Sequence, residues 1–412
     1  FTNGSFTAKT TQRISVETIT AANSVGVNGG AGALDLTSTF LDALTAGSIT
    51  IGSTNLDAAI TANARTWQAP VTFRTKSGAI NINGLQTMGA RQFAAISSNG
   101  GNIVLGASGG VNSSATGDAI VLASSSGNFI NNNAGSPLTA SAGRWLIYST
   151  KPELNTLGSL SGDFFRYSCT YGGSCPSFPS TTNGLLYSFA PTVTVTLLPD
   201  PAVTTYGEAA PTFTYTFSGY NAGDEAADSR TGSAVLSTNY VVGGNAGSYN
   251  IVAAAGTLTS SLGYTFQGST LINGLTVNKR SLTVTGNANT AVYGDSLAGV
   301  ITATITGGYS GDAIVATGSP VSPTYSTGGH LTVGNYATSF ALSGFNPGNY
   351  SVTNTNGTLS ITQRSLAITN VTADNKVYDG NNLAVGVSLN ADNRATGDTG
   401  LDYGFTNATY SD

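Results

Sequence analysis

The side chains that could carry catalysis are few in this sequence of 412 residues. Its one histidine, His330, lies in the Gly-rich stretch Thr327–Leu331 and lacks the Gly-x-Ser-x-Gly pattern of a nucleophilic serine, so we interpret it as a loop residue. A pectin-cleaving enzyme would need aspartates clustered beside Lys or Arg. The aspartates of the first 150 residues are instead widely separated: Asp35, Asp42, Asp57 and Asp118. We therefore expect no catalytic residues, no enzymatic activity and no cofactor.

Metal and phosphate ligands are also sparse. The run Gly106–Gly110 is not followed by Lys-Ser/Thr, and no EF-hand pattern occurs. The acidic stretch Asp224–Asp228 could bind calcium weakly, but we favour a solvated loop. Cys169 and Cys175 flank a Gly-Gly turn and predict a local disulfide, because the composition is that of an extracellular protein; the alternative is two free thiols.

The composition predicts strands and turns rather than helices. Charged residues make up only 8% of the sequence and glycine contributes 53 residues. Thr, Val and Tyr favour strands, whereas Gly and Asn favour turns, so we expect an all-β fold. The net charge is −5, and Lys and Arg form no cluster, which argues against nucleic-acid binding. No apolar run is long enough to span a membrane.

Residues 1–150 contain short apolar triplets separated by Gly, Ser and Asn. Such short strands cannot bury an apolar face alone, but stacked copies form a continuous core. We therefore predict the C-terminal part of a right-handed parallel β-helix; a β-sandwich with irregular loops is the alternative. The predicted strands are Ser48–Ile51, Ala79–Ile82, Asn102–Leu105, Ala119–Leu122 and Asn128–Ile130.

Residues 151–191 predict a cap for this β-helix. An open end would expose apolar groups and unpaired strand edges, and the aromatic run Gly143–Thr150 leads into an irregular stretch that holds the two cysteines. Trp145, Phe164 and Phe165 are the candidates for the core of the cap. The functional alternative for these rings is a sugar-binding platform.

The remainder of the chain consists of repeats. The segment Leu275–Thr285 returns 84 residues later as Leu359–Thr369. We predict a linker at 188–192, repeats at 192–279 and 280–363, and a truncated third copy at 364–412. Alternating apolar and polar residues predict half-buried antiparallel strands, and nearly absent linkers predict a semi-rigid rod. The strand candidates are Thr192–Leu197, Phe213–Phe217, Val300–Ile305, Ser339–Leu342 and Tyr350–Val352.

A turn of the Tyr-Gly-Asp kind recurs in each copy. We expect its tyrosine to be structural, with the ring packed inward and the hydroxyl hydrogen-bonded near the surface: Tyr206, Tyr293 and Tyr378. Tyr249 and Tyr336 form a second equivalent pair with the same expected role. Since Thr409–Asp412 stops within the third copy, we expect a fragment or a processed form of a longer chain.

These motifs resemble a known family. The triplets followed by Gly143–Ser149 look like the C-terminal end of filamentous-haemagglutinin-type exoproteins of two-partner secretion. The Val-Tyr-Gly-Asp repeats resemble the MBG domains of such adhesins, and Val377–Gly380 resembles the opening of a YDG domain. The resemblance implies a secreted fibre on the bacterial cell surface, exported through an outer-membrane transporter.

The function expected from this resemblance is adhesion, aggregation or biofilm-matrix binding. Possible partners are a polysaccharide or other glycan and further copies of the same chain. Two alternatives are a carbohydrate-active β-helix enzyme that uses the repeats as spacers, and a self-assembling extracellular filament subunit. An acidic cluster on one solenoid face would favour the enzyme. The repeat fold could be immunoglobulin-like or β-grasp-like.

Overall fold

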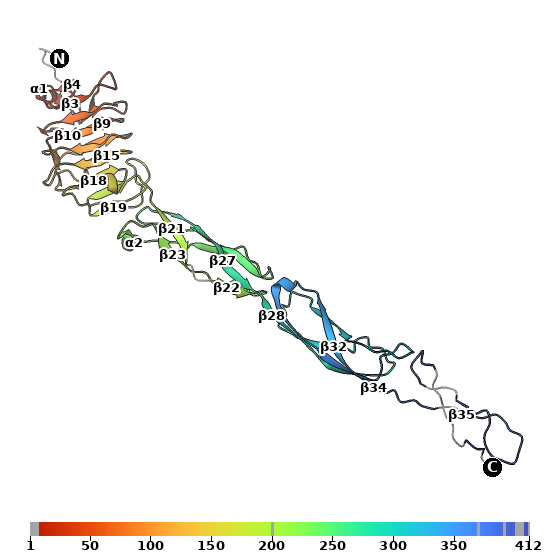
Figure 1. The fold of residues 1–412 in the computed structure, drawn as a ribbon. Coiled ribbons are helices and arrows are strands. Elements are labelled where there is room, and N and C mark those ends of the chain that lie inside the picture. Colours follow the sequence, from red (N-terminus) through yellow and green to blue (C-terminus); the bar gives the residue numbers. More distant parts are fainter. Residues whose placement is uncertain (1–7, 199–201, 369–370, 390–392, 400–407, 411–412) are drawn as a thin grey trace. The chain divides into compact units, whose positions relative to one another are not determined.

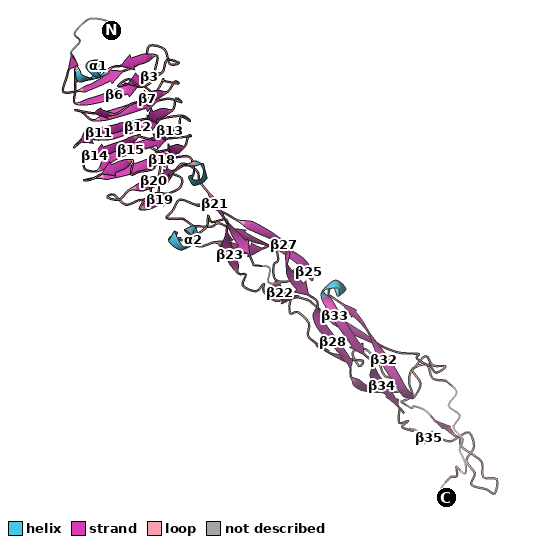
Figure 2. Cartoon of the chain, turned by 60° about the vertical axis from the view of Figure 1, so that its left-hand side comes forward, coloured by secondary structure: helices cyan, strands magenta, loops and turns pink. Residues whose placement is uncertain are grey.

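The computed structural model describes residues 8–198, 202–368, 371–389, 393–399 and 408–410. The described chain is nearly all β, which confirms the predicted all-β class, and Figures 1 and 2 show how little helix it contains. Its helical segments are short: α1 (Ser38–Asp42), α2 (Asp224–Ala227), η1 (Pro152–Leu154) and η2 (Pro347–Asn349). No helix in the described part of the chain is both long and apolar enough to cross a membrane.

The chain divides into two compact units, and the division runs through residues 199–269. Unit 1 comprises Phe1–Leu198, Thr214–Leu236 and Val252–Ser269. Unit 2 comprises Pro199–Phe213, Ser237–Ile251 and Thr270–Asp412. Within residues 192–269, segments that belong to unit 1 alternate along the chain with segments that belong to unit 2. This stretch therefore contributes strands to both units.

Three parallel sheets make up most of unit 1. The eight-stranded sheet has the order β19 (Phe164–Arg166), β20 (Gly184–Tyr187), β18 (Arg144–Ser149), β15 (Asp118–Ser124), β12 (Phe93–Ser97), β9 (Val71–Thr75), β6 (Ser48–Gly52) and β2 (Arg13–Val16). The six-stranded sheet has the order β16 (Phe129–Asn131), β13 (Ile103–Leu105), β10 (Ile80–Ile82), β7 (Ile60–Ala62), β3 (Val25–Val27) and β4 (Leu34–Leu36). The four-stranded sheet has the order β17 (Leu138–Ala140), β14 (Gly110–Ser113), β11 (Leu85–Gly89) and β8 (Arg65–Thr66), and β1 (Ala8–Lys9) pairs with β5 (Leu44–Thr45).

From β6 to β17 the chain visits the eight-, six- and four-stranded sheets in the same cyclic order. Parallel pairing therefore stacks equivalent residues of successive passes directly on one another. In one such column of the eight-stranded sheet, successive members are 22 to 27 residues apart along the chain: Ile51, Phe73, Ala95, Leu122 and Ile147. A second column in the six-stranded sheet contains Ile60, Ile80, Ile103 and Phe129. All of these side chains are buried and belong to one core.

The predicted apolar triplets are strands, but they belong to two sheets. Ser48–Ile51 and Ala119–Leu122 lie in the eight-stranded sheet, whereas the other three lie in the six-stranded sheet. The sequence analysis missed β9 and β12 between them. In β9, Val-Thr-Phe-Arg-Thr, polar residues interrupt the apolar ones, because every second side chain points away from the core. In β12, Phe-Ala-Ala-Ile-Ser, the apolar run Phe93–Ile96 is continuous, so a sequence signal for this strand was present.

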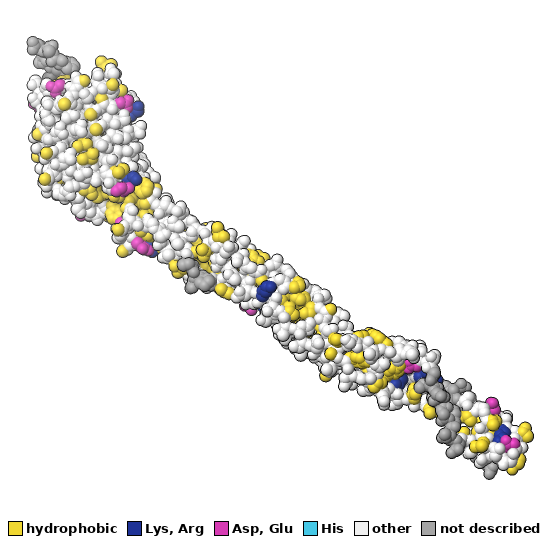
Figure 3. Space-filling view, in the orientation of Figure 1, with side chains coloured by type: hydrophobic (Ala, Val, Ile, Leu, Met, Phe, Trp, Pro, Cys, Tyr) yellow, Lys and Arg dark blue, Asp and Glu magenta, His cyan; other side chains and the backbone are white. Residues whose placement is uncertain are grey.

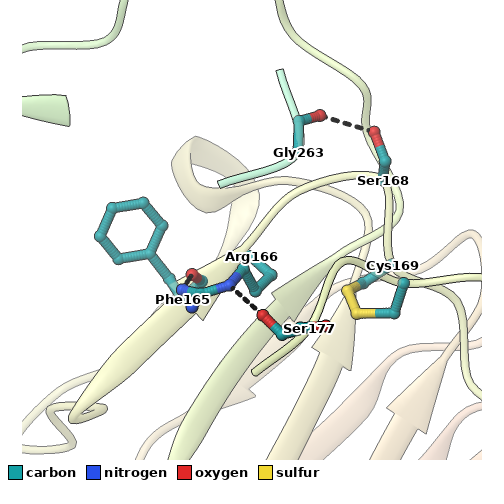
Figure 4. The surroundings of a disulfide bond; sticks show 7 residues. Phe165, Arg166, Ser168, Cys169, Ser177 and Gly263 are labelled. Atoms are coloured by element: carbon teal, nitrogen blue, oxygen red, sulfur yellow. Dashed lines mark hydrogen bonds between the residues drawn. A yellow bond between two sulfur atoms is a disulfide. The ribbon is translucent and has the colours of Figure 1, made fainter. Parts of the chain in front are cut away.

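The eight-stranded sheet continues past residue 150, since β20 pairs with β18 and β19 pairs with β20. Trp145 and Phe164 are buried, and Phe165 is half-buried. The structure joins Cys169 and Cys175 in a disulfide, and Figure 4 shows this loop beside the strands. Around it, the buried side chains of Leu146, Phe164, Cys169 and Leu186 form a separate small cluster with Tyr148, Cys175 and Phe178.

Residues 192–278 and 280–362 form two sheets each, with the same strand order. In the first, the sheets are β23 (Tyr215–Ser218), β21 (Thr192–Leu197), β26 (Thr265–Gln267) and β22 (Ala202–Thr205), β27 (Ser269–Asn278), β25 (Gly247–Ala254), β24 (Val235–Thr238). In the second they are β30 (Ala303–Thr306), β28 (Arg280–Gly286), β33 (Tyr350–Thr355) and β29 (Ala288–Val292), β34 (Gly357–Thr362), β32 (Gly334–Ser343), β31 (Val315–Pro320). Only Lys279 separates β27 from β28.

The expected antiparallel pairing is found for some strands of the repeats, whereas others pair in parallel. β21 pairs with β23 antiparallel but with β26 parallel, and β28 makes the same two kinds of pair with β30 and β33. Alternating apolar and polar residues report a half-buried face and carry no information about the direction of the partner strand.

Replacing a side chain in a stacked column should destabilise unit 1 strongly. Phe73→Ala removes a fully buried ring that also makes an edge contact with Phe93 at 5.2 Å between ring centroids. We expect the free energy of unfolding to fall by about 3–5 kcal/mol. Thr72→Ala, on the same strand but half-buried, should change it by less than about 1 kcal/mol. Urea unfolding measures both, and equal losses would contradict the assigned facing of β9.

Candidate functional site: the tyrosine–aspartate junctions

The Tyr-Gly turns follow directly after edge strands. Tyr206 follows β22 and Tyr293 follows β29, and each backbone N–H continues the parallel pairing by donating to Asn278 or Thr362 at 2.9 Å. The next residue, Gly207 or Gly294, has a φ of +85° or +84°, where a residue with a Cβ would be strained. The glycine therefore lets the chain reverse while the tyrosine keeps its place.

An arginine at the start of the following segment holds each turn. Arg280 Nη1 donates to the Tyr206 carbonyl at 3.1 Å, and Arg364 Nε donates to the Tyr293 carbonyl at 2.8 Å. The acidic residue of each turn pairs with the same arginine: Glu208 with Arg280 and Asp295 with Arg364. Arg280 and Arg364 each begin an Arg-Ser-Leu sequence, and each therefore fixes the preceding Tyr-Gly turn by hydrogen bonds and an ion pair.

The Asp312 carboxylate accepts hydrogen bonds from two tyrosine hydroxyls that belong to different segments. Tyr206 OH donates to Oδ1 at 3.2 Å, and Tyr350 OH donates to Oδ2 at 2.5 Å. Tyr206 is 4% exposed and Tyr350 is 3% exposed, and their rings meet edge to face at 5.4 Å. The backbone N–H of Tyr309 donates to Tyr350 OH at 3.0 Å. Both hydrogen-bonding capacities of the Tyr350 hydroxyl are thus used.

A related contact recurs at residues 364–412. Tyr293 OH lies 2.9 Å from Asp398 Oδ1 and 2.7 Å from Ser326 Oγ. The ring of His330 packs edge-on against Tyr293 at 5.6 Å, and its Nε2 lies 2.8 Å from the Thr396 carbonyl oxygen. His330 therefore supports the junction from its loop, and none of its described contacts forms a catalytic triad.

Unit 1 contains the same arrangement with a tyrosine from the predicted cap. Asp224 Oδ2 accepts from Tyr167 OH at 2.8 Å and from Tyr264 OH at 2.6 Å. Asn221 donates a hydrogen bond to each of the two hydroxyl oxygens: its side-chain amide donates to Tyr167 OH and its backbone N–H donates to Tyr264 OH. Tyr167 thus takes the place in this junction that Tyr206 has at Asp312.

The predicted solvated loop at Asp224–Asp228 is wrong. Asp228 is only 8% exposed, and its Oδ1 accepts from Ser260 Oγ at 2.7 Å and from the Leu262 backbone N–H at 3.2 Å. Its Oδ2 accepts from Tyr220 OH at 2.9 Å. The Asp228 carboxylate can remain buried because hydroxyls and an N–H group replace its water. Among the described residues no group of three or more possible metal ligands gathers.

The junction aspartates have a signal in the sequence. A Gly-Asp pair recurs with the same period as the tyrosines: Gly223-Asp224, Gly311-Asp312 and Gly397-Asp398. The spacings of 88 and 86 residues match the 87 residues between Tyr206 and Tyr293. Gly-Asp pairs are common in turns, so the period rather than the pair itself is informative.

The predicted structural tyrosines behave differently from one another. Tyr206 is buried and Tyr293 is half-buried, each with its hydroxyl bonded as described. Tyr336 is buried, and Tyr249 OH donates to the Asn245 carbonyl at 2.7 Å. For Tyr378 the inward packing is wrong, since its side chain is 87% exposed. The described strands near it, β35 (Val371–Thr372) and β36 (Ser388–Leu389), are too short to offer a face that would cover the ring.

Burial raises the pKa of the junction tyrosines. For Tyr167 and Tyr350 the pKa rises to about 12, chiefly because the phenolate would lose its hydration. The neighbouring carboxylates, Asp224 and Asp312, add to the rise because each accepts the hydroxyl proton and repels a phenolate. The pKa of Tyr264 and that of Tyr206 are also raised, again mainly by burial.

The aspartates of the first 150 residues do not converge in the structure. Asp42 pairs with Arg65 at 2.7 Å, Asp57 with Lys76 at 3.4 Å and Asp118 with Arg144 at 2.6 Å. Each of these three carboxylates thus has its own cation. Asp35 lies exposed on β4.

Comparison with known families identifies one segment of the chain. Residues 193–271 match the MBG domain (YGX type). The matched segment begins in β21 and ends in β27, so it covers most of the strands of the first repeat. No curated protein and no solved structure matches the chain significantly. The match supports an adhesin-like repeat domain in this part of the protein.

Removing one junction hydroxyl should destabilise unit 2. Tyr350→Phe deletes the donor to Asp312 and leaves the backbone N–H of Tyr309 without its acceptor. We expect a loss of about 1–3 kcal/mol in the free energy of unfolding. Tyr325→Phe is the matched control, because that side chain is 59% exposed, and it should change stability by less than about 0.5 kcal/mol. Chemical denaturation measures both; similar losses would rule out a special role for the junction.

Alkaline pH should weaken the junctions. A tyrosine whose pKa is higher in the folded than in the unfolded state keeps its proton longer when folded. Its stabilisation is complete below about pH 10 and is lost as the pH rises towards 12. We expect the melting temperature to fall over this range and to fall less steeply in Tyr350→Phe. Parallel curves for the variant and the wild type would contradict the raised pKa of Tyr350.

Proposed function

We propose that this chain is part of a secreted bacterial surface adhesin of the filamentous-haemagglutinin type, exported by two-partner secretion. The observation that carries the proposal is the MBG match at residues 193–271, next to parallel sheets whose strands return in a fixed cyclic order. That order supports a right-handed parallel β-helix over residues 1–150, with residues 151–191 as its cap. We assign MBG-like repeats to 192–279 and 280–363, and a YDG-like copy to 364–412.

In this proposal the repeats are a stalk that joins the β-helix to the rest of the fibre. The tyrosine–aspartate junctions support this role, because Asp312 and Asp398 each bind a tyrosine of the preceding segment while an arginine holds its turn. An aspartate and an arginine thus contact the same Tyr-Gly turn, and we expect this double contact to oppose bending at that point.

The proposed location is the outer surface of the bacterium or the surrounding medium, reached through an outer-membrane transporter. The disulfide between Cys169 and Cys175 supports an oxidising compartment. The low content of charged residues and the separate ion pairs of Asp42, Asp57 and Asp118 support a structural role over an enzymatic one. The proposed activity is attachment to a surface glycan or to another copy of the chain.

An adhesion assay tests this function. Beads coated with the purified full chain should be retained on biofilm matrix or on mucin-coated glass well above beads coated with the heat-denatured chain. Bead-to-bead clumping in the absence of any surface would instead assign the attachment to self-association. Antibody labelling of intact cells checks the location. Absence of both retention and clumping, or labelling only after the cells are lysed, would refute the proposal.

A further inference from the structure

A cleft of about 560 Å³ lies in unit 1 beside the Asp224 junction. Its walls come from η1, β19, β20 and the segment that precedes α2. Figure 3 shows hydrophobic side chains gathered at the β19 end of the parallel sheets. The volume falls within the range typical of small-ligand sites.

Aromatic side chains form most of the cleft. Tyr167 and Tyr187 are buried, with ring centroids 5.8 Å apart. Phe165 is half-buried and packs edge-on against Tyr167 at 5.7 Å, and Figure 4 shows its ring directed away from the disulfide loop. Phe189 is 41% exposed. The site thus has a floor of buried tyrosines, with the half-buried Phe165 and the exposed Phe189 beside it.

Polar groups at the cleft can bond a hydroxylated ligand. Glu153 and Asp224 supply carboxylate oxygens and Asn221 supplies an amide, and all three line the cleft. Asp224 is held in place by the two tyrosine hydroxyls of its junction, so its position is set before any ligand arrives. A few preoriented polar groups among aromatic faces are typical of sites that select a ligand by orientation.

The charges around the cleft disfavour ions of either sign. No Lys or Arg is among its described lining residues, whereas two carboxylates are, so an anionic ligand would be repelled. The ammonium of Lys151 lies 5.1 Å from the centre of the Phe189 ring and 3.1 Å from Glu153. A second cation would meet this ammonium at the most exposed ring.

We propose that this cleft binds an uncharged oligosaccharide. The C–H faces of its sugar rings would stack on Phe165 and Phe189, and its hydroxyls would donate to Glu153 and Asp224. The inference rests on the proposed adhesive function and adds the class of ligand. The sugar-binding platform considered for Trp145 and Phe164 is not available, since both side chains are buried; the cleft uses Phe165 with Phe189 instead.

Saturation-transfer NMR and calorimetry on the full chain test the site. The probes are maltotriose, cellotriose, N-acetylated chitotriose and lactose, with sialyllactose as the anionic probe and trilysine as the cationic one. We expect at least one uncharged sugar to bind. Phe189→Ala should weaken that binding by about tenfold or more, equivalent to about 1.4 kcal/mol. Binding of maltotriose or cellotriose would indicate a matrix glucan as the ligand, whereas binding of lactose would indicate a host-type glycan.

Matched variants keep the test specific. Tyr171→Ala removes an aromatic ring that is 40% exposed but lies outside the described lining of the cleft, and it should change the affinity by less than about twofold. Glu153→Gln alters an exposed side chain with little risk to folding and should weaken binding by about threefold or more. Circular dichroism confirms that each variant is folded.

Three outcomes would overturn the proposal. These are binding of none of the uncharged sugars, preference for sialyllactose or trilysine, and wild-type affinity in Phe189→Ala. Running the bead assay with Phe189→Ala separates this inference from the adhesive function. Beads that adhere regardless of the substitution would refute the cleft while leaving adhesion intact, whereas a lack of adhesion by the wild type would refute the function itself.

Discussion

A half-buried carboxylate that accepts hydrogen bonds from tyrosine hydroxyls is the interaction on which the C-terminal half of this protein depends. Asp312 binds Tyr206 and Tyr350, and Asp224 binds Tyr167 and Tyr264. A charge removed from water needs such partners, and breaking one leaves a polar group unsatisfied. The tyrosine rings also pack on one another, so a single contact combines apolar burial with a directional bond. That combination can hold two segments in a fixed relation with few residues.

The N-terminal half is held by repetition of a different kind. Parallel pairing places Ile51, Phe73, Ala95, Leu122 and Ile147 in one column, so every pass covers the apolar side chains of the one before. A strand of three residues is sufficient here, because its neighbours supply the rest of the core. The eight-stranded sheet ends at β19, which has a strand neighbour on one side. Tyr167 follows β19 directly and donates its hydroxyl to Asp224. The cleft proposed to bind sugar lies where these two modes of stabilisation meet.

The two modes suit the extracellular location proposed for this protein. Both use hydroxyl, amide and apolar groups, and charged residues make up only 8% of the sequence. Stability then depends little on ionic strength, because isolated surface ion pairs contribute little. The folded state should instead be sensitive to alkaline pH, because the junction tyrosines then lose their hydroxyl protons. Any ligand specificity must come from exposed loops and clefts, since the sheets themselves are occupied by packing.

The sequence by itself determined the all-β class, the apolar triplets, the period near 85 residues and the nearness of Cys169 and Cys175, because each of these is local or repeats at a fixed spacing. Only the tertiary structure decided which sheet each triplet joins and that β26 and β33 pair in parallel. It also decided that the half-buried Asp224 and the buried Asp228 lie in hydrogen-bond networks. It also decided that Tyr378 is exposed while Tyr206 is covered. The physical reason is that strand direction and side-chain burial depend on partners distant in the chain, and a residue's type does not say which partner will cover it.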